Sequence, residues 1–172
     1  MKKEAIIKNF AAGLKLFFGF FLGVGFISTG WSYFLISTPP TWKKWEDAYA
    51  LAVKEKRIII LDVYTDWCGW CKKMDKDTYE NPQVLESIQK KFVAVKINPE
   101  KNVKYLYKGQ TYTAAQLLRE LTRIAGEGIS GYPTTLFVVP RENAQDHVHV
   151  VGGYLGPKEF LQALSQLQAY YP

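Results

Sequence analysis

Cysteine, histidine and methionine are scarce in this chain, with two of each among 172 residues. Two cysteines cannot build a framework of several disulfides, nor a zinc site of four thiolates. The two His and two Met leave few other soft ligands, so we expect no resident metal. No glycine-rich Gly-x-Gly-x-x-Gly segment follows a predicted strand, so we expect no nicotinamide or flavin cofactor.

Basic charge is also limited. The net charge is +6 and no run of five or more Lys or Arg occurs, so nucleic acid is not the expected partner. Apolar residues make up 48% of the chain and charged residues 22%, which excludes wholesale disorder. The length suits one domain of ordinary size with its own core.

The first 37 residues differ from the rest. Residues 1–15 carry four Lys and one Glu, and residues 16–37 are 22 residues without any charge. A helix of that length covers about 33 Å, enough for the hydrocarbon core of a membrane. We therefore predict a cytoplasmic basic N-terminus (1–15), a transmembrane signal anchor (16–37) and an extracytoplasmic domain (38–172). The alternative is a signal peptide cleaved near Ser28-Thr29-Gly30.

Strand and helix patterns alternate after residue 40, which predicts an α/β domain. Thr41 is the expected N-cap of the first helix. We expect helices at 41–56, from Cys68 onward, 84–91, 114–125 and 157–170. We expect strands at 57–64, 92–97, 134–139 and 147–151.

Cys68 and Cys71 are three residues apart at the expected start of a helix. That spacing lets one disulfide join them. The helix N-terminus favours an anion, which lowers the pKa of the Cys68 thiol and makes it the expected nucleophile, with Cys71 as the resolving thiol. Taken alone, the pair could also be two buried structural thiols or half of a metal site.

The surrounding residues resemble the thioredoxin superfamily. The segment from Trp67 to Lys72 resembles the WCGPCK active-site motif, with Trp70 in place of proline. Four further positions match the family in the same order: Asp62, Lys96, the Gly131–Thr134 loop and Gly153. The resemblance covers residues 41–170 and implies a central mixed sheet flanked by helices. It is greatest to membrane-anchored or periplasmic thiol:disulfide interchange proteins of bacteria.

The resemblance also implies roles for individual residues. Asp62 is expected to accept the proton of Cys71, supported by Lys96; the alternative is a structural ion pair of these two residues. A cis bond is expected before Pro133. Substrate is expected to contact five residues: Trp67, Gly69, Trp70, Tyr132 and Pro133.

Two segments have no such assignment. Residues 101–113 look like an insertion, which either bears on partner choice or is a passive surface loop. His147 and His149 share one face of a strand, but no third ligand is evident, so we expect ordinary exposed histidines.

These observations predict an enzyme, a thiol-disulfide oxidoreductase on the outer side of the bacterial inner membrane. We expect it to reduce protein disulfides with electrons from a membrane partner. Three alternatives stay open at this point: a disulfide-donating oxidant, a module that handles copper(I) through the two thiolates, and a non-catalytic domain with the same fold.

Overall fold

The computed structural model describes residues 40–170. The predicted basic segment 1–15, the predicted anchor 16–37 and the alternative cleavage site lie outside the described residues, so the proposed division of the chain stays a prediction. None of the helices between residues 40 and 170 is both long enough and apolar enough to cross a membrane.

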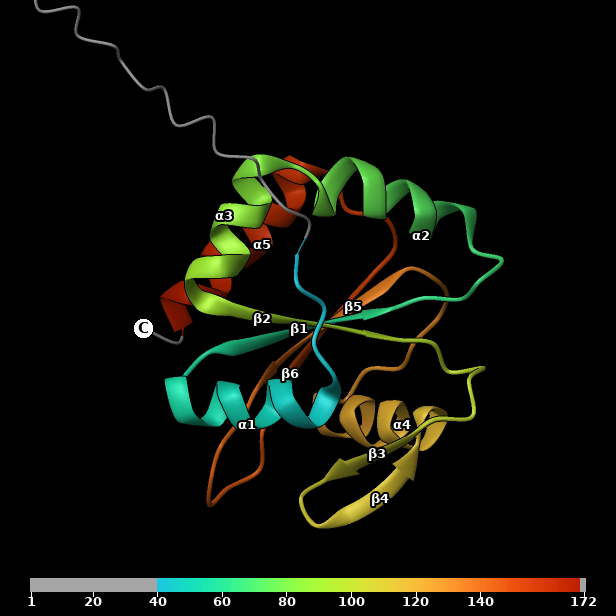
Figure 1. Cartoon of the computed structure of the whole chain (residues 1–172), viewed down its shortest axis with the longest axis vertical. Coiled ribbons are helices and arrows are strands. Elements are labelled where there is room, and N and C mark those ends of the chain that lie inside the picture. The colour runs from blue at the N-terminus through green and yellow to red at the C-terminus, as the bar shows by residue number, and fades with distance from the viewer. Residues whose placement is uncertain (1–39, 171–172) are drawn as a thin grey trace, which may run out of the picture. The chain divides into compact units, whose positions relative to one another are not determined.

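A four-stranded mixed sheet forms the centre of the described part, in the order β2-β1-β5-β6 (Figure 1). Only β1 and β2 are parallel, and β5 and β6 each run antiparallel to their neighbours. All six residues of β1 are buried, as expected for a central strand covered on both faces. The strands are β1 (Ile58–Val63), β2 (Phe92–Ile97), β5 (Thr134–Val139) and β6 (His147–Gly152).

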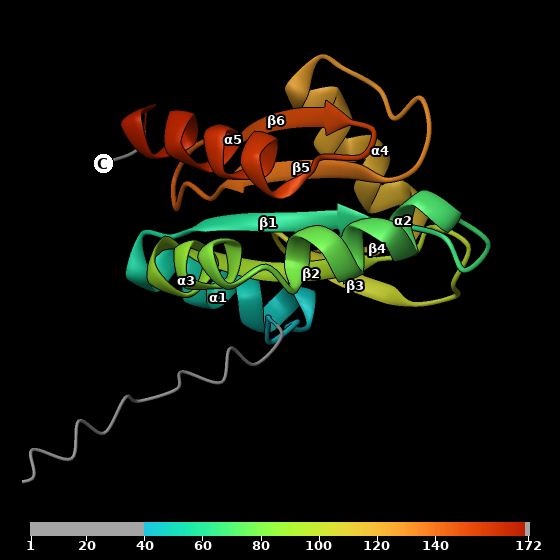
Figure 2. The ribbon, with the colours of Figure 1, turned by 90° about the horizontal axis from the view of Figure 1, so that it is seen from above.

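Helices cover both faces of the sheet, which confirms the predicted α/β class (Figure 1). One face carries α1 (Trp45–Glu55) and α4 (Ala114–Ala125). The other carries α2 (Gly69–Met74), the π-helical turn η1 (Asp75–Tyr79), α3 (Pro82–Lys91) and α5 (Pro157–Tyr170). Figure 2 shows β6, β5 and β1 side by side, with α2, α3 and α5 along the sheet.

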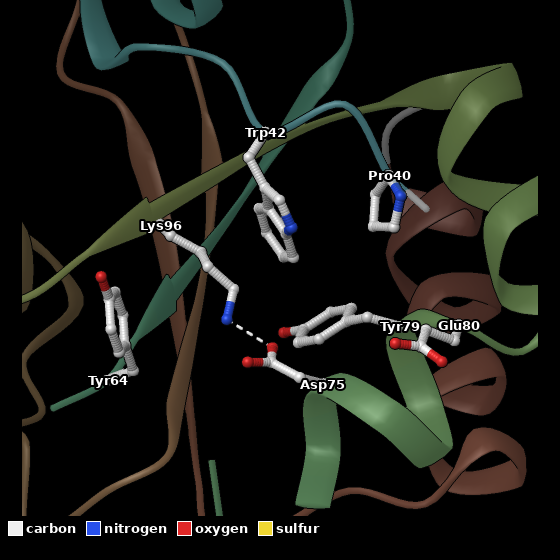
Figure 3. A pocket seen from close by; sticks show the side chains of 7 residues that line it. All are labelled: Pro40, Trp42, Tyr64, Asp75, Tyr79, Glu80 and Lys96. Carbon is white, nitrogen blue, oxygen red and sulfur yellow. Dashed lines mark hydrogen bonds and ion pairs between the residues drawn. The ribbon is translucent and has the colours of Figure 1, made fainter. Parts of the chain in front are cut away.

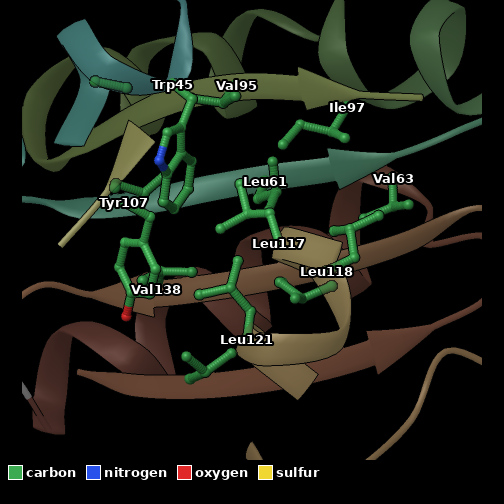
Figure 4. Close-up of a cluster of buried hydrophobic side chains, with 14 of the residues drawn as sticks. Trp45, Leu61, Val63, Val95, Ile97, Tyr107, Leu117, Leu118, Leu121 and Val138 are labelled. Carbon is green, nitrogen blue, oxygen red and sulfur yellow. The ribbon is translucent and has the colours of Figure 1, made fainter. Parts of the chain in front are cut away.

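Side chains of β1 alternate between two hydrophobic clusters. Leu61 and Val63 enter the cluster formed with α1 and α4 (Figure 4), whereas Ile58 and Ile60 enter the cluster formed with α3 and α5. Each such buried aliphatic side chain contributes about 1.5–3 kcal/mol by leaving water. The alternation places the side chain of Asp62 on the face that α2 and η1 cover.

The first helix begins later than predicted, and Thr41 is not its N-cap. Helix α1 starts at Trp45, with Lys44 as an N-cap that makes no side-chain hydrogen bond. The reason lies in tertiary pairing: Lys43 forms a bridge with Val95, and its N–H donates to the carbonyl of Ala94 at 2.9 Å. The preceding segment is therefore extended along the edge of β2.

The other helices agree closely with the prediction. Helix α3 begins two residues early because Asn81 accepts hydrogen bonds from Gln83 N and Val84 N. Helix α4 has the predicted bounds, with a capping box between Thr113 and Gln116 and a left-handed residue, Gly126, at its end.

Residues 101–113 contain a β-hairpin rather than a loop, formed by β3 (Lys104–Tyr107) and β4 (Gln110–Thr113). Its two-residue turn, Lys108-Gly109, has positive φ at both positions, as a type I′ turn requires. Leu106 fastens the hairpin to α1: its carbonyl accepts from Trp45 Nε1 at 3.1 Å and its N–H donates to Glu46 at 2.9 Å. The segment is therefore an ordered hairpin rather than a loop, and its part in partner choice stays a prediction.

Candidate active site

The Cys68–Cys71 disulfide lies at the start of α2, after the loop that follows β1. Cys68 is the N-cap of α2, and its Sγ accepts a hydrogen bond from Cys71 N at 3.0 Å. This confirms the prediction that one disulfide joins the two cysteines at the start of a helix. Both residues are buried in the disulfide form, with 4% and 3% exposed. Exposure in this state therefore does not separate an attacking from a resolving thiol, but the N–H facing Cys68 favours a thiolate there.

The loop before β5 has the predicted cis bond between Tyr132 and Pro133. The carbonyl of Pro133 accepts from Gly153 N at 2.8 Å, and Gly153 has a φ of +90° that favours glycine. The ring of Tyr132 lies 5.9 Å from that of Trp67, edge to face. The predicted loop is thus held beside the residue that precedes the disulfide.

An exposed aromatic surface flanks the disulfide. Trp67 is 68% exposed and Trp70 is 59% exposed, which is unusual for such large apolar side chains. Trp67 donates from Nε1 to Glu100 at 2.9 Å, and Trp70 lies 5.5 Å from Tyr154. Between the two, Gly69 opens onto free space, since a Cβ there would meet no atom within 4 Å. A protein segment can therefore approach the disulfide between two aromatic side chains.

Asp62 is 2% exposed and pairs with Lys96, whose Nζ lies 3.0 Å from Asp62 Oδ2. Burial raises the pKa of Asp62 from 3.8 to about 6, and the attraction of Lys96 offsets only part of that rise. A carboxyl group with this pKa can work as a base near neutral pH. The ion pair expected as the alternative is present, and the proton transfer from Cys71 to Asp62 stays a prediction.

Lys96 holds a second carboxylate that sequence reasoning missed, Asp75 of η1. Burial alone would lower the pKa of Lys96, but Asp62 and Asp75 together raise it. Asp75 follows Cys71 by four residues, a spacing that puts two side chains on one face of a helix and could have identified it.

A cavity of about 350 Å³ opens beside Lys96. Figure 3 shows the side chain of Lys96 between Trp42 and Tyr64, with the ammonium group directed at Asp75. Its Nζ lies 4.9 Å from the ring centres of both Trp42 and Tyr64. This side of the candidate site is therefore charged and lined by aromatic rings, and no sequence pattern had pointed to Trp42 or Tyr64. The lining residues are Pro40, Trp42, Tyr64, Asp75, Tyr79, Glu80 and Lys96.

His147 and His149 lie exposed on β6, as predicted. Across residues 40–170, no group of three or more His, Cys, Asp or Glu side chains could hold a metal ion.

The mixed sheet, the disulfide at a helix N-terminus and the cis-proline loop define the class: a thioredoxin-like protein. The thioredoxin from Thermus thermophilus has the same fold, with a TM-score of 0.58 and 21% identity, covering 76% of this chain and 88% of that one. The predicted resemblance to the superfamily is confirmed.

The chain belongs to the Thioredox_DsbH family, described as a protein of unknown function (DUF255), which matches residues 28–171. Its relatives include thiol:disulfide interchange protein DsbD of Tatumella citrea, 29% identical over 119 residues, and uncharacterized protein B0495.5 of Caenorhabditis elegans, 27% identical over 107 residues. These matches cover 69% and 60% of this chain but only 18% and 13% of the relatives. The chain is thus a thioredoxin-like relative of thiol-disulfide oxidoreductases and corresponds to a small part of much longer proteins.

Proposed function

We propose that this chain reduces disulfides in other proteins by dithiol exchange through Cys68 and Cys71. The observation that carries the proposal is the Cys68–Cys71 disulfide at the start of α2, with the buried carboxyl of Asp62 on the face of the sheet that α2 covers. The exposed rings of Trp67 and Trp70 supply a surface on which a protein substrate can bind.

The reaction starts from the reduced pair. The Cys68 thiolate attacks one sulfur of a substrate disulfide, which breaks the substrate S–S bond, forms a mixed disulfide and releases the other substrate sulfur as a thiolate. Cys71 gives its proton to Asp62 and attacks Cys68 Sγ. The substrate leaves with both sulfurs reduced, and its two electrons have come from the Cys68–Cys71 pair, which ends as the disulfide.

We further propose that the charge-free segment 16–37 anchors the chain in a bacterial inner membrane, with the domain on the extracytoplasmic side. The basic residues before this segment and its length support that orientation. Disulfides persist in that compartment, so a reductant there needs electrons from a membrane protein. The relative from Tatumella citrea is a thiol:disulfide interchange protein, which agrees with such a chain of exchange.

The reduction potential of the Cys68–Cys71 pair tests the proposed direction. The full chain, in a mild detergent, is equilibrated with glutathione buffers and the free thiols are counted, with Cys71→Ser as the control for unpaired thiol. A potential near that of thioredoxin, about −270 mV, is the expected result. A potential near about −120 mV would reverse the direction and make the chain an oxidant. If no disulfide forms in any of the glutathione buffers, the proposed function is wrong.

A further inference from the structure

Three buried polar groups on the face of the sheet that α2 and η1 cover make no hydrogen bond within the described residues. Asp62 Oδ1, the Tyr79 hydroxyl and Thr135 Oγ1 have no hydrogen-bond partner of normal geometry among the described residues. All three residues are buried, at 2%, 2% and 0% exposure. Asp62 and Thr135 are register partners on β1 and β5, so they lie next to each other. Buried polar groups in folded proteins are nearly always hydrogen-bonded, so neighbouring groups of this kind are expected to bond to one another.

Packing fixes the position of the Tyr79 ring. It contacts Trp42 and Phe160 edge to face, with ring centres 4.9 and 5.3 Å away. Figure 3 shows the hydroxyl end of Tyr79 directed toward Lys96 and Asp75. The Lys96 ammonium lies 5.8 Å from the Tyr79 ring centre and 3.0 Å from Asp62 Oδ2. The hydroxyl therefore points into the group of charges around Asp62.

The electrostatics of the two groups are consistent with their proximity. Burial, and then the charge of Asp62, raises the pKa of Tyr79 well above its usual value, so its hydroxyl keeps its proton and can donate it in a hydrogen bond. Three side chains act on the Asp62 carboxyl: Lys96 from β2, and Asp75 and Tyr79 from η1. Lys96 and Tyr79 favour its ionised form, whereas Asp75 opposes it.

We propose that Tyr79 is a positioning residue for the reaction, whose hydroxyl donates a hydrogen bond to Asp62, directly or through one bridging water. The bond holds the carboxylate ionised and oriented as the acceptor of the Cys71 proton. The π-helical turn η1 presents both Asp75 and Tyr79 to this group, and such turns are frequent at functional sites. The hydrogen bond is inferred from the buried polar groups and from the packing of the Tyr79 ring. Its part in proton transfer rests on the proposed function.

The test is the titration of the Asp62 carboxyl in Tyr79→Phe. The variant removes one buried oxygen and keeps the ring contacts, so we expect it to fold. Carboxyl carbon NMR of the full-length disulfide form, in a mild detergent, follows Asp62, with Asp62→Asn identifying the signal. Loss of a donor to the ionised form should raise the titration midpoint by about one pH unit.

Tyr107→Phe is the matched control. Tyr107 is as buried as Tyr79, at 3% exposure, and its hydroxyl donates to another buried carboxylate, Asp146 Oδ2, at 2.9 Å. It should leave the Asp62 midpoint unchanged. An equal midpoint in Tyr79→Phe and the unmutated chain overturns the inference, as does an equal shift in both variants. In the unmutated chain the Tyr79 Cζ signal should move with the Asp62 midpoint, and a Cζ signal that stays constant there also overturns it.

A second readout links the bond to the reaction. A rise of one unit from a midpoint near 6 should slow release of the mixed disulfide about five-fold at pH 6 and leave it nearly unchanged at pH 8.5. A uniform loss at all pH values would indicate a structural role and contradict the proposal. If Asp62 shifts in Tyr79→Phe but the unmutated chain reduces no disulfide, the proposed function fails while the hydrogen bond stands.

Discussion

Replacing Asp62 by asparagine should stabilise the folded chain at neutral and alkaline pH. Burial raises the pKa of Asp62 from 3.8 to about 6, so the folded state binds this proton more tightly than the unfolded state does. The stabilisation that this proton brings is full below the unfolded value and is lost as the pH rises through about 6. A shift of two units corresponds to about 3 kcal/mol.

Asparagine keeps the shape of the neutral carboxyl and carries no charge at any pH, so the variant avoids this loss. Lys96 retains Asp75 as an ion-pair partner in the variant. We therefore expect Asp62→Asn to unfold at a higher urea concentration than the unmutated chain at pH 8. Its free energy of unfolding should be higher by about 2–3 kcal/mol. At pH 4 the two should differ by less than about 1 kcal/mol. The disulfide form is used, so that no thiol titrates.

Asp146→Asn is the matched control. Asp146 is equally buried, but its oxygens accept from Tyr49, Tyr107 and the Arg141 N–H, and Lys108 lies 2.7 Å away. Removing its charge weakens these bonds, so this variant should lose about 1–3 kcal/mol at pH 8. An Asp62→Asn variant that is no more stable than the unmutated chain at pH 8, or whose gain does not change with pH, would refute the reasoning.

Three further predictions concern substrate, specificity and fold. Cys71→Ala should accumulate a mixed disulfide with its substrate through Cys68, seen as a band sensitive to reductant, whereas Cys68→Ala should not; trapping by Cys68→Ala alone would exchange the roles of the two thiols, and equal trapping would contradict the assignment. Trp70→Ala should raise the KM for a protein disulfide several-fold and leave a small aromatic disulfide unaffected, because Trp70 is exposed beside the disulfide; an equal effect on both would contradict substrate contact. Trp45→Phe should cost about 1–3 kcal/mol in urea unfolding, because it removes the donor to the Leu106 carbonyl; an unchanged midpoint would mean that this bond does not fasten the hairpin.

Local signals explain why most of the fold could be predicted. The β-branched runs of β1 and β5 and the amphipathic pattern of α4 can each be recognised from the residues of that segment alone. The start of α1 was mispredicted because a long-range bridge between Lys43 and Val95 overrides a local capping signal at Thr41. The hairpin, by contrast, had a local signal: Lys108-Gly109 between two alternating segments is a two-residue turn pattern.

Some residues of the candidate site could be predicted from the sequence, and others only from the structure. Cys68, Cys71, Asp62 and Lys96 follow from spacing along the chain and from the resemblance, and the structure brings Asp62 and Lys96 together. Trp42 and Tyr79 could not be found from spacing, because they reach Lys96 from the segment before α1 and from η1. Their part depends on the packing of those segments, which no single stretch of sequence displays.

The two buried aspartates of the domain show how function can be separated from stability. Asp146 has hydroxyl, N–H and ammonium partners and ties the hairpin to α1 and to the start of β6. Asp62 shares one ammonium with Asp75 and has one oxygen without a bond of normal geometry. Burial, which Lys96 offsets only in part, raises the pKa of Asp62 to about 6, so this carboxyl can gain and lose a proton near neutral pH. Asp62→Asn should therefore combine greater stability with slower release of the mixed disulfide, and a variant that gained stability at no cost in rate would remove Asp62 from the mechanism.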